Sequence, residues 1–133
     1  MSVRRSILVV DDQMHITRII KRSLSAQGYD VELAQNGEQA LGLLQSRGFD
    51  VLLTDYQMPR MNGKDLCETI RADMPDKVGF MILSTAVADE SLRSWAENLG
   101  EAIYLEKPVS MRRLLVLIDE YFSRAADVGE LAG

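Results

Sequence analysis

Short apolar runs alternate with amphipathic segments along the whole chain. Three runs are continuously apolar, which is typical of strands buried on both faces of a sheet: residues 7–10, 51–53 and 80–83. Two weaker runs, 31–34 and 102–105, predict edge strands. After each run, apolar residues recur at helical spacing. The helical stripes are Ile16, Ile19, Ile20 and Leu24; Ala40, Leu41 and Leu44; Leu66 and Ile70; Leu92, Trp95, Ala96 and Leu99; and Leu114, Ile118, Tyr121 and Phe122.

Helix boundaries are marked by residues with known capping preferences. Asn36 is expected to cap the second helix, and the final helix begins after Ser110. Gly28, Gly48 and Gly100 are expected to end the first, second and fourth helices. Strands that alternate with helices imply right-handed crossovers and a parallel sheet covered on both faces. We therefore predict one doubly wound α/β domain, a five-stranded sheet in the order 2-1-3-4-5.

Polar side chains follow the predicted central strands and the last strand. Asp11 and Asp12 follow the first strand, Asp55 ends the third, Thr85 follows the fourth, and Lys107 follows the fifth. In a doubly wound sheet, ligands bind beyond the carboxyl ends of the strands, at the point where the strand order reverses. For this order the reversal lies between strands 1 and 3. The sequence therefore predicts that these side chains meet in one site.

The predicted site favours phosphoryl transfer assisted by magnesium. Clustered carboxylates repel one another, so at least one of the three should have a raised pKa unless a cation lies among them. Mg²⁺ binds carboxylate oxygens, and no histidine or cysteine is near enough to indicate zinc. Lys107 and Thr85 are suited to hold phosphoryl oxygens, and an aspartate can accept the group as an aspartyl phosphate. Each residue alone is commonly a turn or cap residue, but together they indicate one chemistry.

Composition narrows the class of protein further. The 133 residues suit a single domain, which we place at residues 1–125, with 126–133 as a short tail or the start of a linker. A net charge of −5 argues against direct binding of nucleic acid. No apolar run approaches the roughly 20 residues that a membrane-spanning helix requires. The single cysteine, Cys67, excludes an intrachain disulfide and is expected to be a half-buried thiol.

Taken together, these motifs resemble the receiver domain of two-component response regulators, the CheY-like fold. The resemblance runs from about residue 6 to residue 122. It rests on these elements: Asp11-Asp12, Asp55, Met58-Pro59, Gly63, Thr85-Ala86, Tyr104 and Lys107-Pro108. The 22 residues from Thr85 to Lys107 fit the family's usual interval and favour Thr85 over Ser84 as the functional hydroxyl.

The resemblance implies a role for each of these residues. Asp55 would be the phosphoryl acceptor, and Lys107 would pair with the carboxylate or the phosphoryl oxygens. Thr85 would move toward the phosphoryl group, and Tyr104 would follow it. The implied Mg²⁺ ligands are Asp11, Asp12, Asp55 and the backbone carbonyl of Gln57.

The resemblance also implies partners. The donor would be a sensor histidine kinase or a histidine phosphotransfer protein. A downstream protein would bind the face made by the fourth helix, fifth strand and fifth helix. The chain would be cytoplasmic, a monomer or a phosphorylation-dependent dimer. It would not be an enzyme with a separate substrate, although it would promote its own phosphoryl transfer and dephosphorylation.

Two positions depart from the chemotaxis protein's pattern. Gln57 replaces an asparagine and Val87 replaces a glutamate. Both positions border the water that attacks the acyl phosphate, which leaves the phosphate lifetime open.

Three alternatives stay open at this point. The chain is either a single-domain regulator or a receiver fragment of a longer one, because only 25 residues follow Pro108 and no output domain fits there. A phosphohydrolase with an aspartate nucleophile would commonly carry a second acid where Gln57 stands. A flavodoxin-like cofactor binder would need a phosphate loop rich in Gly, Ser or Thr, whereas Asp11 and Asp12 would repel phosphate.

Overall fold

The computed structural model describes residues 5–87 and 89–132, with side chains to residue 126. Strands and helices alternate along the chain as follows: β1 (Ser6–Val10), α1 (Met14–Ala26), β2 (Asp30–Ala34), α2 (Gly37–Ser46), β3 (Phe49–Asp55), α3 (Gly63–Asp73), a 3-10 turn η1 (Pro75–Lys77), β4 (Val78–Thr85), α4 (Ser91–Leu99), β5 (Ala102–Glu106) and α5 (Met111–Ala132). The sheet is parallel, in the order β2-β1-β3-β4-β5. The predicted fold class and strand order are confirmed.

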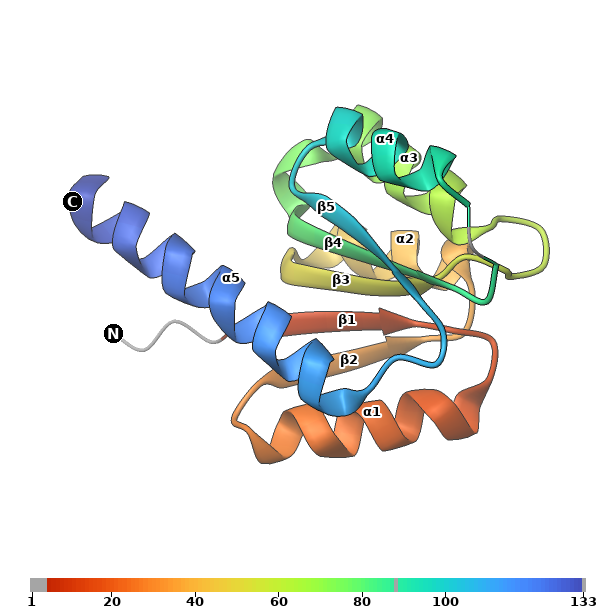
Figure 1. Cartoon of the computed structure of the whole chain (residues 1–133), viewed down its shortest axis with the longest axis horizontal. Helices are drawn as coiled ribbons and strands as arrows, with labels where there is room; N and C mark the ends of the chain where they lie inside the picture. Colours follow the sequence, from red (N-terminus) through yellow and green to blue (C-terminus); the bar gives the residue numbers. More distant parts are fainter. Residues whose placement is uncertain (1–4, 88, 133) are drawn as a thin grey trace.

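The two faces of the sheet carry separate apolar cores. Because side chains alternate along a strand, Ile7 and Val9 of β1 face one core and Leu8 and Val10 face the other. The Ile7 core is closed by residues of α1 and α5, whereas the Leu8 core is closed mainly by α2 and α3, with α4 at its edge. Figure 1 shows α1 and α5 on one side of the sheet and α3 and α4 on the other. Covering both faces explains why the central strands are continuously apolar.

Several predicted boundaries are confirmed by the cap geometry. The Asn36 side chain accepts a hydrogen bond from the Gln39 N–H, and the Ser110 hydroxyl accepts one from the Arg113 N–H. Gly28 and Gly100 follow α1 and α4 with φ of 93° and 85°, in the left-handed region that glycine adopts without steric cost. These helix ends therefore lie where the sequence predicts them.

Two details of the sequence interpretation need correction. Gly48 follows the C-cap Arg47 of α2 as Gly28 follows the C-cap of α1, but its φ does not lie in the left-handed region, so it does not end the helix as Gly28 and Gly100 do. A Cβ at Gly48 would lie 3.0 Å from the Lys77 carbonyl oxygen, so the glycine allows two chain segments to approach closely. Ile19 does not face the core: it is 60% exposed, and Thr17 is buried in its place. The Thr17 hydroxyl donates to the Met14 carbonyl at 2.8 Å, which allows a polar residue on the buried face of α1.

The segment predicted as a tail continues the last helix. The backbone of α5 runs to Ala132, and Gly133 and residues 1–4 lie outside the described residues. In Figure 1 the end of α5 extends past the sheet. In the described part of the chain, no helix has the length and apolar character needed to cross a membrane.

Candidate functional site

Three carboxylates meet at the carboxyl edge of the sheet. Asp11 and Asp12 follow β1, and Asp55 is the last residue of the neighbouring strand β3. Each offers a carboxylate oxygen, and these oxygens all lie within 4.8 Å of one another. Asp11 and Asp55 are buried, whereas Asp12 is exposed. The structure thus brings together the three acids that the sequence predicted for one site.

Backbone contacts fix the position of Asp55. It pairs with Ser84 of β4, and the next N–H, that of Tyr56, donates to the Ser84 carbonyl at 2.8 Å. The Gly63 N–H donates to the Tyr56 carbonyl at 2.8 Å, which closes the loop that follows the acid. A side chain at Gly63 would collide with the Asp55 carbonyl oxygen and come within 2.7 Å of a Leu83 methyl group. The loop from Asp55 to Gly63 therefore requires glycine because of close approach.

Burial and mutual repulsion shape the charge of the site. Burial raises the pKa of Asp11 most strongly, the Gln13 N–H that donates to its Oδ1 at 2.9 Å opposes this, and the nearby Asp55 carboxylate raises the pKa further. The expectation that at least one carboxyl of the cluster has a raised pKa is confirmed. Such a site gains from a bound cation, since the cation relieves the repulsion between buried carboxylates.

Lys107 supplies one positive charge to this cluster. Its Nζ lies 2.7 Å from Oδ1 of Asp55, and its backbone N–H donates to the Thr85 carbonyl at 2.7 Å. Among the described residues, the Asp55 Oδ1 accepts no hydrogen bond of good geometry. The contact is therefore mainly electrostatic. Since no well-aligned donor occupies this buried carboxylate oxygen, it is suited to bind a cation or to attack an electrophile.

The donor set fits a hard divalent cation. All the clustered ligands are carboxylates, and Mg²⁺ usually takes one or two carboxylates, waters and phosphate oxygens. In the described part of the chain, no backbone N–H donates to the carbonyl of Gln57, so this oxygen remains available. Its participation in a metal site stays a prediction.

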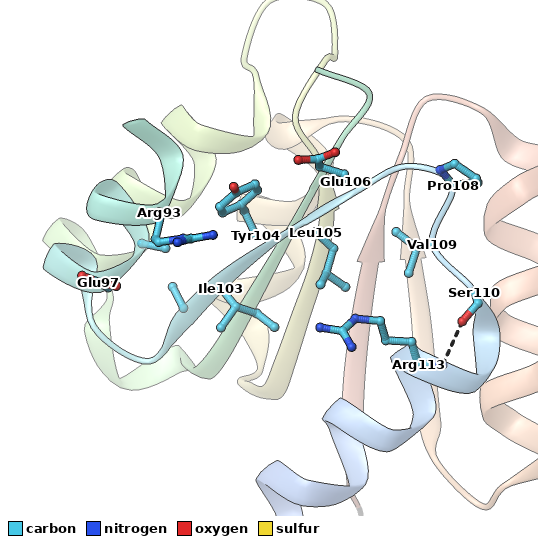
Figure 2. A pocket seen from close by; sticks show the side chains of 12 residues that line it. Arg93, Glu97, Ile103, Tyr104, Leu105, Glu106, Pro108, Val109, Ser110 and Arg113 are labelled. Atoms are coloured by element: carbon cyan, nitrogen blue, oxygen red, sulfur yellow. Dashed lines mark hydrogen bonds between the residues drawn. The ribbon is translucent and has the colours of Figure 1, made fainter. Parts of the chain in front are cut away.

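The predicted switch residues lie on the two strands beyond β3, Thr85 at the end of β4 and Tyr104 on β5. Thr85 is buried, and its hydroxyl accepts a hydrogen bond from the Val87 N–H at 3.1 Å. Tyr104 is half-buried on β5 and lines a groove of about 610 Å³ between α4, β5 and the start of α5. Figure 2 shows Tyr104 in this groove with Arg93, Glu106 and Arg113. Tyr104 thus lies in an open groove, whereas the Thr85 hydroxyl already has a hydrogen-bond partner in the segment that follows β4.

Sequence reasoning missed an apolar cavity of about 470 Å³ that reaches Asp55 and Lys107. It is lined mainly by apolar residues, including Ile16 and Ile20 of α1, and Val109 and Met111 after β5. The available signal was the apolar pair Pro108-Val109 directly after Lys107, opposite the stripe of α1. The acceptor is therefore bordered by an apolar surface on the α1 side.

Comparison with known proteins supports the reading of this geometry. The response regulator receiver domain model matches residues 7–119. The response regulator MprA of Mycobacterium bovis is 40% identical over 115 residues, which cover 86% of this chain and 48% of that protein. MprA of Mycolicibacterium vanbaalenii is 39% identical over 109 residues, 82% of this chain and 46% of that protein. The chain thus spans about half the length of the curated relatives it matches.

Solved structures share the fold over nearly their whole length. The signal receiver domain of an HD domain-containing protein from Pseudomonas fluorescens has a TM-score of 0.82 at 32% identity, covering 94% of this chain and 99% of that one. The Vibrio cholerae chemotaxis protein CheY4 has a TM-score of 0.80 at 27% identity, covering 90% of this chain and 99% of that one.

Proposed function

The chain belongs to the response regulator receiver domain family, and we propose that Asp55 is the residue that accepts its phosphoryl group. The observation that carries this assignment is the environment of Asp55 Oδ1. This oxygen is buried, lies 2.7 Å from the Lys107 ammonium and accepts no hydrogen bond of good geometry among the described residues. It belongs to the same cluster as Asp11 and Asp12.

The transfer step follows from this geometry. An oxygen of the Asp55 carboxylate forms a bond to phosphorus while the bond from phosphorus to the donor's histidine nitrogen breaks, and the imidazole leaves. Lys107 holds a positive charge beside the acceptor, where negative charge on the phosphoryl oxygens accumulates. Because phosphoryl transfer depends mostly on positioning and charge neutralisation, a site without a separate base is sufficient.

Magnesium is the proposed cofactor. Asp11, Asp12, Asp55 and the Gln57 carbonyl would hold it, and when bound it would neutralise charge on the phosphoryl oxygens. The carboxylates of this chain would also control the charge of the site. They keep the site negative, so that an anionic phosphoryl group is held only when cations are present.

The proposed output is a change at the face formed by α4, β5 and α5. The phosphoryl oxygens offer the Thr85 hydroxyl a charge-assisted hydrogen bond, which is stronger than a neutral one. Movement of Thr85 makes room for the Tyr104 ring, which lines the groove at this face. A downstream protein would read this groove, which also carries Arg93, Glu97 and Arg113.

Receiver domains are signalling domains, and the family implies a histidine kinase partner. We assign this chain a sensor kinase or a histidine phosphotransfer protein as donor and a place in the cytoplasm. The domain also promotes loss of its own phosphate, at a rate that Gln57 and Val87 help to set. Both residues line a small cavity that Thr85 also lines.

Mass spectrometry tests the acceptor assignment. With acetyl phosphate and Mg²⁺, the protein should gain about 80 Da, the mass of one phosphoryl group. Asp55→Asn should abolish this gain. Asp73→Asn, a change of the same kind at an exposed position at the end of α3, should retain it. Equal labelling of Asp55→Asn and the unmodified protein would overturn the assignment.

A further inference from the structure

The apolar cavity beside Asp55 has the size of a binding site for a small organic molecule. Its volume is about 470 Å³, and small-molecule sites occupy roughly 300–1,000 Å³. One wall is α1, with Ile16 and Ile20, and another is the segment that follows β5, with Val109 and Met111. These four apolar side chains are only half-buried. The protein thus keeps an apolar surface partly open next to its proposed acceptor.

The polar end of this cavity is negatively charged. Asp11, Asp55 and Lys107 line it, and both acids are buried. Together with Asp12, three carboxylates surround one ammonium group. In the part of the chain whose side chains are described, no second basic residue forms an ion pair with these acids. Asp55 Oδ1 accepts no hydrogen bond of good geometry there either, so this end of the cavity is complementary to a cation that donates hydrogen bonds.

We propose that the cavity binds a small amphipathic organic cation, such as an alkylammonium ion. Its apolar body lies between α1 and the segment that follows β5, and its ammonium group contacts the carboxylates of Asp11 and Asp55. An ammonium group has three donors, which suits carboxylate oxygens that lack donors of their own. A neutral molecule of the same shape gains only the apolar contact. A carboxylate of the same shape places its charge beside two buried acids, which is unfavourable.

Such a ligand would inhibit the receiver. Its ammonium group occupies the carboxylate oxygens that a divalent cation and the phosphoryl group also need, so Asp55 accepts phosphate more slowly while the ligand is bound. Because binding linkage is reciprocal, Mg²⁺ weakens binding of the organic cation to the same extent that the organic cation weakens binding of Mg²⁺. The effect on phosphorylation rests on the proposed function of Asp55, whereas the binding itself does not.

Titration of the full chain with n-hexylammonium at pH 7 tests the proposal, without Mg²⁺ and with NMR detection of methyl groups. The methyl resonances of Ile16, Ile20 and Val109 should shift together. Hexanol has the same chain without the charge and should bind about tenfold more weakly or worse, since it lacks the charge-assisted hydrogen bond. Hexanoate should not bind measurably. From butylammonium to hexylammonium, each added methylene should raise the affinity about fourfold, as expected for burial of a methylene.

Variants separate the two halves of the site. Val109→Trp should fill the cavity and weaken binding of hexylammonium about tenfold or more. Val116→Trp is the matched control, since it makes the same change at an exposed position of α5 that does not line this cavity. Ile16→Phe narrows the cavity from the α1 side and is the second variant if Val109→Trp does not fold. Asp11→Asn keeps the oxygen that accepts the Gln13 N–H, but it should reduce the preference for hexylammonium over hexanol.

Circular dichroism of every variant confirms that it is folded. The proposal is overturned if the methyl groups of the cavity do not respond to hexylammonium, or if hexanol or hexanoate binds as tightly. It is also overturned if Val116→Trp weakens binding as much as Val109→Trp does, or if Asp11→Asn keeps the full preference for the cation. None of these outcomes depends on phosphorylation of Asp55, so failure of the acceptor assignment would leave them unchanged.

Discussion

Nζ of Lys107 lies 2.7 Å from Oδ1 of Asp55, although 52 positions separate the two residues in the chain. The parallel sheet makes this contact possible, because β3 and β5 both end at its carboxyl edge on either side of β4. Lys107 is thus the positive charge directly beside Asp55 in a cluster of three carboxylates. Its removal should make the site more negative and more attractive to cations.

We predict that Lys107→Met binds Mg²⁺ more tightly than the unmodified protein, by about tenfold. The lysine competes with the metal for the same carboxylate oxygen, so its loss removes that competition. Isothermal titration calorimetry measures the two affinities. Lys21→Met, at an exposed position on α1, should leave the affinity unchanged. Weaker binding by Lys107→Met would show that the lysine does not compete with the metal.

Asp12 should be required for Mg²⁺ but not for folding. It is exposed, whereas its neighbour Asp11 is buried. We expect Asp12→Ala to lose measurable Mg²⁺ binding, while its free energy of unfolding without metal changes by less than about 0.5 kcal/mol, as for most surface substitutions. The affinity of the unmodified protein for Mg²⁺ alone should be weak, since two or three carboxylates leave much of the ion's hydration in place. Calorimetry and urea denaturation measure the two quantities, and unchanged Mg²⁺ binding would argue against this site.

Gly63→Ala should be strongly destabilising. The added methyl group would collide with the Asp55 carbonyl oxygen, a backbone atom of strand β3, and would come within 2.7 Å of a Leu83 methyl group. We expect a loss of roughly 1–3 kcal/mol, the usual cost of overpacking a well-packed core. Phosphorylation with acetyl phosphate should also slow, because the Asp55 loop must shift.

Gly42→Ala provides the opposite case in the same chain. Gly42 lies in the middle of α2 on its solvent-exposed face, and a Cβ there would meet no atom within 4 Å. Alanine should stabilise the helix by about 0.5–1 kcal/mol. Chemical denaturation of both variants checks the pair. Equal effects at Gly42 and Gly63 would mean that close approach to Asp55 is not what requires glycine.

Cys67 should be chemically silent. The sequence suggested a half-buried thiol, but the side chain is fully buried, and burial raises its pKa from 9.0 to about 12. Thiol reagents at pH 8 should therefore react with the native protein only when it unfolds. The stability that the protonated thiol contributes is present below pH 9 and is lost as the pH rises toward 12, because the unfolded chain releases its proton first. Serine at this position should remove that dependence, and rapid labelling of the native protein would contradict this prediction.

The fold was predictable because its signals are periodic. Continuous apolar runs marked the central strands, and the order 2-1-3-4-5 followed from placing them inside the sheet. The meeting of Asp55 with Lys107 followed as well, since strand ends share one edge. What failed was local. Ile19 fits the apolar stripe of α1 but is 60% exposed, and Thr17 is buried because its hydroxyl bonds to the Met14 carbonyl within the helix.

Side-chain contacts to the backbone at the ends of strands and helices were not predictable from periodicity. The Arg71 guanidinium donates to the carbonyls of Val78, Gly79, Gly100 and Glu101 and so joins α3 to the start of β4 and to the connection between α4 and β5. Nothing in the spacing of Arg71 indicates these partners. The bond between the Thr85 hydroxyl and the Val87 N–H was missed for the same reason. Such contacts depend on loop conformation, which residue pattern specifies weakly.

The two hydrogen bonds of the Thr85 hydroxyl indicate how the predicted switch at this residue could work. The hydroxyl accepts from the Val87 N–H at 3.1 Å, while its own proton is directed at the Val87 carbonyl at a long 3.4 Å. A hydroxyl has one proton to donate but can still accept. The threonine can therefore turn its proton to a phosphoryl oxygen and give up only the weaker of the two bonds. A charge-assisted hydrogen bond is worth roughly 1.5–3 kcal/mol, which amounts to about a 13- to 160-fold change in population.

We predict that beryllofluoride, a mimic of the phosphoryl group, shifts amide resonances of α4 and β5 as well as those beside Asp55. Thr85→Ser keeps the proton and should retain the remote shifts, whereas Thr85→Ala should lose them while resonances near Asp55 still respond. Tyr104→Phe should keep them too, because the ring moves by filling space and not through its hydroxyl. Shifts confined to the Asp55 pocket in the unmodified protein would show that the groove around Tyr104 does not respond to phosphorylation. Remote shifts that persist in Thr85→Ala would show that another residue connects Asp55 to that groove.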